Sequence, residues 1–231
     1  MAGCVGLDCV TFKNGTQYRF EDHFPPAPAK VAVSMSGGVE SAILLAILID
    51  RYGKDNILVV SIEFPGRRRW ESTHPKYIAD LLNIKTTHVV PATSPAMTSK
   101  EYFQIFLNAK ESYGFDYWFS GLNCNQFSDS AITSPLVVER LKKQGYIVPF
   151  VWLKKWQTIE LHVLLGFEDL LIMTHSCTQQ PPEMQHCGQC YCCHERAYGF
   201  LELGQLDSTT YNIPLLHVQR KALNFIEGSS V

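Results

Sequence analysis

A serine- and glycine-rich turn near the start of the chain has the composition of an anion-binding site. The segment SGGVES, residues 36–41, follows the apolar run VAVS and precedes the apolar run AILLAILI. Between a strand and a helix, its backbone N–H groups and hydroxyls would lie at the positive end of the helix dipole, and its glycines would let the backbone approach a ligand. The turn lacks the lysine of a Walker A loop and the spacing of the dinucleotide fingerprint. It predicts a phosphate site of another kind, with a simple tight turn as the alternative.

Near the other end of the chain, four cysteines have the spacing of a metal site. They are Cys177, Cys187, Cys190 and Cys193, and the last three repeat with two residues between neighbours. Four thiolates form a closed tetrahedral site for Zn²⁺, so we expect structural zinc here. His186 or His194 could replace the fourth ligand. We expect Cys192 to be a buried or free thiol, because adjacent residues rarely both reach one ion.

Strand-like and helical runs alternate between these two motifs. The strand-like runs are 31–34, 57–64, 86–90, 116–121 and 146–150, and the helical runs between them are 40–52, 75–83, 99–114 and 135–145. Parallel strands need crossover helices and are buried on both faces. The pattern therefore predicts an α/β fold with a doubly wound, largely parallel, Rossmann-like sheet. In such a sheet, the turn at 36–41 lies at the carboxyl end of the first strand, where ligands usually bind.

Smaller segments flank this predicted domain, which we place at residues 30–173. Residues 1–29 should form a β-hairpin around Asn14-Gly15, a type I′ turn signal, followed by a stiff proline-rich connector. Residues 174–231 should form a zinc-binding region with two helical stretches, at 194–205 and 214–228.

Composition and charge narrow the class of protein. The 231 residues are 46% hydrophobic and 18% charged, which indicates a globular chain. The formal net charge of -2 gives no reason to expect a polyanionic partner, so any nucleic-acid contact has to be local. The apolar run 42–49 is much shorter than the roughly 18 residues of a membrane span. No export signal begins the chain, so we expect a cytoplasmic protein without a membrane contact.

Together, the two motifs resemble those of a known family. SGGVES resembles the S-G-G-x-D-S loop of the PP-loop ATP pyrophosphatases, with Glu40 in place of the aspartate. Residues 176–196 resemble the S-C-x(8–9)-C-G-x-C-x-x-C-x-x-R segment of the 7-cyano-7-deazaguanine synthase (QueC) family. Between the motifs, Arg67 and Glu71 match the family's F-D-Y-G-Q-R-H-type loop after the second strand. Pro149, Trp152 and Lys155 match its P-L-x-W-x-x-K segment.

The resemblance implies that the chain binds ATP and Mg²⁺ and that its zinc is structural. It implies catalytic roles for Glu40, Lys155 and Arg67. The phosphates of ATP should lie against residues 36–41, and the adenine should lie near the end of the second strand, at 61–64. The implied nucleotide-binding residues are Ser34, Ser36, Gly37, Gly38, Val39, Glu40, Ser41, Glu63 and Phe64.

The resemblance also implies a substrate, a 7-deazaguanine carboxylate. ATP would adenylate it, ammonia would displace AMP to give an amide, and a second ATP would drive dehydration to a nitrile. The family's Arg-Asn pair is replaced by Thr98-Ser99, and the stretch that includes Gln126 to Ser134 lacks the family's arginine. Two alternatives therefore stay open: a different carboxylate or carbonyl, such as a modified nucleic-acid base, or an inactive QueC-like binding or scaffold protein. A homodimer is compatible with each.

Overall fold

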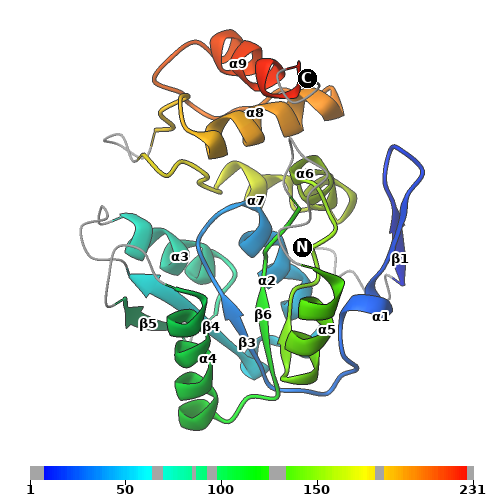
Figure 1. The fold of residues 1–231 in the computed structure, drawn as a ribbon, viewed down its shortest axis with the longest axis vertical. Coiled ribbons are helices and arrows are strands. Elements are labelled where there is room, and N and C mark those ends of the chain that lie inside the picture. Colours follow the sequence, from blue (N-terminus) through cyan, green and yellow to red (C-terminus); the bar gives the residue numbers. More distant parts are fainter. Residues whose placement is uncertain are drawn as a thin grey trace.

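A five-stranded parallel sheet lies at the centre of the molecule (Figure 1). The computed structural model describes residues 8–63, 70–84, 87–92, 98–124, 134–179 and 185–227. The strands of this sheet are β3 (Val31–Ser34), β4 (Ile57–Glu63), β5 (Thr87–Pro91), β6 (Tyr117–Ser120) and β7 (Tyr146–Ile147). Within the described ranges their order is β5-β4-β3-β6-β7, and each neighbouring pair is parallel. The largely parallel sheet predicted from the sequence is confirmed.

Helices cover both faces of the sheet because successive side chains of a strand point to opposite faces. The covering helices are α2 (Val39–Tyr52), α3 (Trp70–Leu81), α4 (Ser99–Tyr113) and α5 (Pro135–Lys143), and a short 3-10 turn, η1 (Lys54–Asn56), leads from α2 into β4. On β3, Val31 and Val33 pack with α2 and α3. The intervening Ala32 packs on the other face, with α4 and α5. This two-sided burial is that of a doubly wound α/β fold.

A second helical layer follows the sheet in the chain. It contains α6 (Lys155–Leu164), α7 (Glu168–Ile172), α8 (Tyr191–Leu203) and α9 (Leu215–Glu227). In Figure 1, α8 and α9 lie at the top, and α6 and α7 lie between them and the sheet. The sequence predicts a helical pattern around His162 but not the bounds of α6. The reason is that every residue from Lys155 to His162 is buried, so the segment has no polar stripe that would mark where the helix begins and ends.

The N-terminal hairpin is present, but its turn is not the expected one. β1 (Cys9–Thr11) and β2 (Gln17–Arg19) pair antiparallel, and the short helix α1 (Phe20–His23) follows. The Phe12 N–H donates to the Thr16 carbonyl at 2.9 Å, which leaves a three-residue loop. Gly15 has a φ of +82°, whereas Asn14 is not among the described residues with positive φ. The type I′ prediction was wrong because that turn needs positive φ at both central residues.

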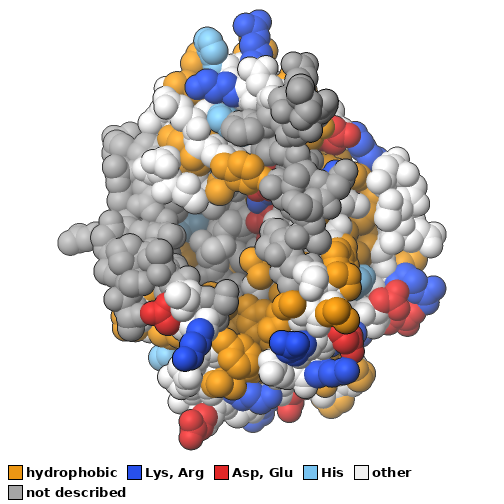
Figure 2. All heavy atoms as spheres, viewed as in Figure 1, with side chains coloured by type: hydrophobic (Ala, Val, Ile, Leu, Met, Phe, Trp, Pro, Cys, Tyr) orange, Lys and Arg blue, Asp and Glu red, His pale blue; other side chains and the backbone are white. Residues whose placement is uncertain are grey.

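The face of the molecule drawn in Figure 2 has a mixed surface. Hydrophobic side chains gather in its lower half, over the region between α4 and α5, and Lys or Arg and Asp or Glu side chains border them. The exposed apolar residues of these two helices include Leu107, Leu136 and Val137. Among the described helices, none combines the length and the apolar character needed to cross a membrane. The boundaries proposed at residues 29/30 and 173/174 stay predictions.

Candidate nucleotide and metal site

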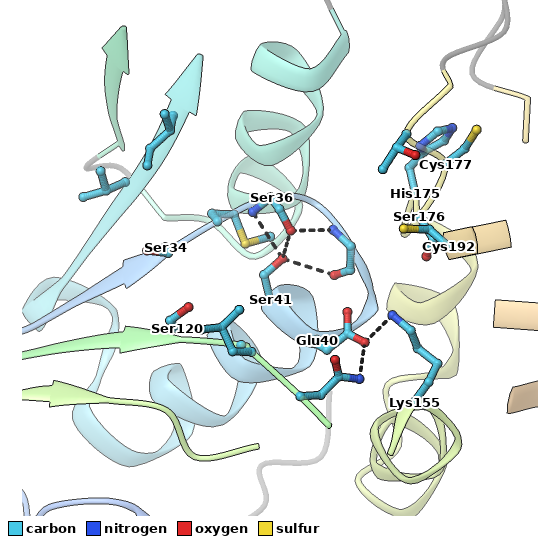
Figure 3. A pocket seen from close by; sticks show the side chains of 18 of the residues that line it. Ser34, Ser36, Glu40, Ser41, Ser120, Lys155, His175, Ser176, Cys177 and Cys192 are labelled. Atoms are coloured by element: carbon cyan, nitrogen blue, oxygen red, sulfur yellow. Dashed lines mark hydrogen bonds and ion pairs between the residues drawn. The ribbon is translucent and has the colours of Figure 1, made fainter. Parts of the chain in front are cut away.

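A cavity of about 410 Å³ opens at the carboxyl ends of β3 and β6 and beside β4 (Figure 3). In open α/β sheets this edge is where ligands bind. The turn after β3, the start of α6 and the segment before the cysteine cluster each contribute to its wall. Prominent lining residues are Ser36, Glu40, Ser41, Lys155, His175 and Cys192. The predicted anion turn and the predicted catalytic lysine, 115 positions apart in the chain, therefore share one cavity.

Hydrogen bonds within the turn fix its shape. The Ser36 and Ser41 hydroxyls point toward one another, with 3.1 Å between their Oγ atoms (Figure 3). Ser41 Oγ also donates to the Gly38 carbonyl at 3.2 Å, and the Gly38 N–H donates to Ser36 Oγ at 3.3 Å. The two serines thus hold the glycine backbone in a curved conformation at the cavity wall.

The turn requires a glycine at position 37 and leaves the start of α2 uncapped. Gly37 has a φ of +79°, and a Cβ there would lie 2.5 Å from Cδ2 of His74. The His175 N–H donates to the Gly37 carbonyl at 3.0 Å, which anchors the turn from its other side. Gly38 is the N-cap of α2, and it offers no side chain to the first N–H groups of the helix. These groups are the donors that an anion needs.

Three charged side chains meet beside the turn. The Lys155 ammonium forms an ion pair with Glu40 Oε1, and it lies 3.5 Å from Glu195 Oε2. Asn123 Nδ2 donates to the same Glu40 oxygen at 3.0 Å. The Lys155, Glu40 and Glu195 side chains are only 6%, 14% and 9% exposed. Two buried carboxylates, of which only Glu40 lines the cavity, therefore lie near one ammonium, in a place where water screens these charges little.

This arrangement keeps Lys155 charged. Burial lowers the pKa of the Lys155 ammonium, but the Glu40 and Glu195 carboxylates more than offset that effect, and the pKa is raised above its ordinary value of 10.5. A lysine that stays protonated at neutral pH can neutralise a phosphate charge but cannot act as a base. This charge limits Lys155 to electrostatic interactions at this wall.

The opposite part of the cavity is less charged. Tyr102 OH and Ser34 Oγ lie 2.6 Å apart, and Trp118 Nε1 donates to Ser34 Oγ at 2.8 Å. Burial raises the pKa of the Tyr102 phenol, which therefore stays neutral. Val60 and Ile62 of β4 add apolar surface beside it. Apolar walls with a few fixed polar groups are typical of small-molecule sites.

The four predicted cysteines form one cluster. The sulfurs of Cys177, Cys187, Cys190 and Cys193 all lie within 4.8 Å of one another. Individual separations are 3.4 Å for Cys190–Cys193, 3.9 Å for Cys187–Cys193 and 4.0 Å for Cys177–Cys190. Four thiolates at ~2.3 Å from a tetrahedral zinc ion would be about 3.8 Å apart, so this donor set fits a metal. The N–H groups of Gln189 and Cys190 also point at Cys187 Sγ, each at 3.3 Å, as donors to a thiolate.

The side chains considered as alternative ligands have other partners. His186 Nε2 accepts from the Ser176 N–H at 3.0 Å, and His194 Nε2 bonds to the Gly188 carbonyl at 3.2 Å. The fourth cluster member is therefore Cys177, as the spacing predicted. Cys192 is outside the cluster, and its half-buried thiol lines the cavity instead. Burial raises its pKa to about 11, so the thiol is protonated at neutral pH.

The structure brings most of the predicted nucleotide residues together. The cavity is lined by Ser34, Ser36, Gly38, Glu40, Ser41 and Lys155. Gly37, Val39 and Glu63 are not among the lining residues, and Val39 lies in a core cluster with α6 and α8. Phe64, Arg67 and Gln126 lie outside the described residues.

Sequence reasoning missed several side chains at this site. Asn123 could have been found, because it follows the end of β6 and so must lie at the ligand edge of the sheet. Tyr102 sits in a helical pattern that predicts only core packing. Glu195 carries no signal in the sequence, since its contact with Lys155 depends on how α8 packs against α6.

Comparisons with known proteins point to one family. The family described as "Queuosine biosynthesis protein QueC" matches residues 125–204, which include the start of α6 and all four clustered cysteines. The 7-cyano-7-deazaguanine synthases of two strains of Leptospira biflexa serovar Patoc are each 25% identical to this chain, over 76% of this chain and 91% of the relative. Among solved structures, the U34-tRNA thiolase NcsA from Methanococcus maripaludis, with its [4Fe-4S] cluster, is 11% identical and covers 91% of this chain and 84% of its own. Its TM-score is 0.43, a likeness too remote to support an argument.

Proposed function

We propose, from this chain's place as a divergent member of the QueC family, that it is an ATP-dependent enzyme that activates a carboxylate by adenylation. The curated relatives are 7-cyano-7-deazaguanine synthases, so the first candidate substrate is a 7-deazaguanine carboxylate, with ammonia as the second reactant. The observation that supports the proposal best is the uncapped turn at the start of α2, which faces the cavity beside a buried ammonium. Products would be AMP, pyrophosphate and an amide or nitrile.

In this proposal each part of the cavity has one task. The backbone and hydroxyls of residues 36–41 bind the phosphates of ATP, and Lys155 faces the charge that develops on the departing pyrophosphate. The apolar wall with Tyr102 receives a planar ring. Glu40 would hold Mg²⁺ through Oε2, since Lys155 and Asn123 both donate to Oε1. When bound, Mg²⁺ would neutralise part of the phosphate charge.

The metal of the cysteine cluster, which we propose to be zinc, would have a structural task. The four thiolates close its coordination sphere, so no position stays open for a substrate. The cluster joins the segment after α7 to the first turn of α8, and α8 packs on α6, which carries Lys155. A metal ion there would hold the second helical layer against the cavity.

The direct test is product analysis. Purified protein would be incubated with ATP, Mg²⁺, ammonium and 7-carboxy-7-deazaguanine, and AMP, pyrophosphate and the nitrile would be measured by chromatography and mass spectrometry. We expect all three, and we expect Lys155→Met to abolish them while the metal content stays unchanged. Absence of AMP and of pyrophosphate with this substrate would contradict the proposal.

One observation favours a second candidate, a different substrate. The family's Arg-Asn pair corresponds to Thr98-Ser99, and the structure shows that Thr98 caps α4. Its Oγ1 accepts from the Glu101 N–H at 3.3 Å, and Glu101 Oε2 accepts from the Thr98 N–H at 2.7 Å. A side chain used in a capping box cannot replace an arginine that holds a substrate. In that case the enzyme would release pyrophosphate from ATP when it is given another carboxylate or carbonyl compound, and it would release none with the deazaguanine.

A further inference from the structure

Lys155 has two acidic neighbours, and they come from different parts of the fold. Glu40 belongs to the first turn of α2, at the nucleotide turn, whereas Glu195 belongs to α8, two positions after the cluster residue Cys193. Glu40 contacts the ammonium directly and lines the cavity, whereas Glu195 lies 3.5 Å from the ammonium and is not among the lining residues. The lysine is thus the only described side chain that links the nucleotide turn to α8 through ion pairs.

The balance of these charges changes when the site is loaded. Without nucleotide, the Lys155 ammonium has two buried carboxylates beside it. A metal ion on Glu40 Oε2 would neutralise that carboxylate, and the Lys155 ammonium would then depend on its other neighbour. A buried charge that loses its partner is costly, because the protein interior does not solvate it.

We propose that Glu195 is a positioning residue, which supplies the counter-charge that keeps Lys155 at the cavity wall once a metal ion on the nucleotide has taken up the charge of Glu40. This inference rests on the proposed function, because it assumes that nucleotide phosphates and a divalent cation occupy the turn. Glu195 stands at an unspecified position of the family's C-x-x-C-x-x-R segment, so the family pattern does not predict it.

The first test needs no nucleotide. Glu40→Gln removes the charge of Glu40 as a bound metal would, and Lys155 exposure can then be measured by acetylation of folded protein and mass spectrometry. We expect Lys155 to stay protected in Glu40→Gln and to become at least roughly tenfold more reactive in Glu40→Gln/Glu195→Gln, since a buried ammonium without a counter-charge leaves its site. The exposed Lys143, 75% accessible, is the internal reference. Equal protection in the single and double variants would overturn the proposal.

The second test uses binding, and it stays decisive where the double variant does not fold. By calorimetry, Glu195→Gln should weaken Mg²⁺·ATP binding about tenfold, as expected for the loss of one partner of a buried charge pair. It should leave the affinity for metal-free pyrophosphate within about twofold, because Glu40 still balances Lys155 there. Glu195→Asp should restore part of the affinity. Glu202→Gln, farther along α8 and bonded to Tyr198, is the matched control with no expected effect.

The outcomes separate the inference from the function that it assumes. If Glu195→Gln weakens the binding of Mg²⁺·ATP and of pyrophosphate equally, Glu195 only maintains the fold. If it weakens the binding of neither, Lys155 does not need Glu195 as a counter-charge. Each result overturns the positioning role and leaves ATP use intact. A wild-type protein that binds neither ligand would overturn the proposed function and, with it, this inference.

Discussion

Gly121 lies against the first turn of α2, so closely that a Cβ on it would come within 3.0 Å of the backbone carbon of Glu40 and of the Ser41 nitrogen. Gly121 directly follows β6, and its lack of a side chain lets this strand end and the nucleotide turn touch. The contact leaves no room for a side chain between this strand end and the start of α2. Because both partners are backbone, the neighbour cannot rotate away from an added methyl group.

Gly121→Ala should therefore lower the free energy of unfolding by about 1–3 kcal/mol, the usual cost of an overpacked contact. It should also weaken ATP binding, since the start of α2 has to shift. For stability, and not for ATP binding, Gly38→Ala is the control, because a Cβ at Gly38 has no neighbour closer than 3.5 Å. Urea unfolding of both variants makes the comparison, and equal losses would show that the Gly121 contact is not tight.

Removal of one cluster thiolate should destabilise the second helical layer. We expect Cys190→Ser to lose the bound metal and to expose α8 and α9 to hydrogen exchange, because metal binding and folding are coupled in such sites. Cys192→Ser is a close control, since its thiol lines the cavity and lies outside the cluster. Elemental analysis should give one metal ion per chain for the wild type and for Cys192→Ser. A full metal content in Cys190→Ser would rule out the four-thiolate site.

The parts of the fold that repeat a local pattern could be predicted from the sequence. Each strand of the central sheet and each of its covering helices follows from alternating apolar runs, and the metal cluster follows from the spacing of Cys187, Cys190 and Cys193. These features depend on near neighbours in the chain. The position of the nucleotide turn at the sheet edge also follows, because a turn after a parallel strand has no other place to lie.

The rest depends on contacts between distant segments. The helix α6 is buried from Lys155 to His162, so its sequence has no polar stripe that marks where the helix begins and ends. Glu195 and Asn123 reach the site from α8 and from the segment after β6, and no local pattern ties either residue to Glu40 or Lys155. The predicted type of the hairpin turn was wrong for a local reason. The pair Asn14-Gly15 is compatible with loops of two and of three residues, and the structure has the longer loop.

Stability should fall in mild acid because of a buried histidine that packs against the start of α2. His162 is fully buried on α6, and its Nε2 lies 3.0 Å from the carbonyl of Val39, the first residue of α2. Burial lowers the pKa of His162 from its ordinary 6.5 to about 4. Between pH 6.5 and pH 4, His162 is therefore protonated in the unfolded chain and neutral in the folded chain. The stabilisation is complete above pH ~6.5 and is lost as the pH falls toward 4, by roughly 3 kcal/mol for this residue.

Urea unfolding at pH 7 and at pH 5 measures this effect. The free energy of unfolding of the wild type should be lower at pH 5, and His162→Gln should reduce the difference, because glutamine can donate to the Val39 carbonyl but does not titrate. The same substitution at the exposed His217 of α9 is the control. A pH difference unchanged by His162→Gln would show that other groups cause the acid sensitivity.

Glu40 separates an active enzyme from an inactive relative. Its side chain is one methylene longer than the aspartate of the family's loop, and in the structure its carboxylate forms an ion pair with the Lys155 ammonium. Mg²⁺ tolerates little departure from octahedral geometry, so ATP cleavage should depend strongly on this side chain.

If the chain is an active adenylating enzyme, Glu40→Gln should abolish pyrophosphate release, because the amide keeps the shape but not the charge. Glu40→Asp should leave release measurable or raise it, since the shorter carboxylate restores the family's loop and frees Lys155 for the phosphates. If the chain is an inactive relative, the wild type will release no pyrophosphate with any deazaguanine, and Glu40→Asp alone will not restore it, because Thr98 caps α4 where the family has its Arg-Asn pair. Pyrophosphate assays on the three proteins, with metal content and unfolding midpoints measured in parallel, distinguish these cases. Release by the wild type that persists unchanged in Glu40→Gln would show that the carboxylate serves only as the counter-ion of Lys155.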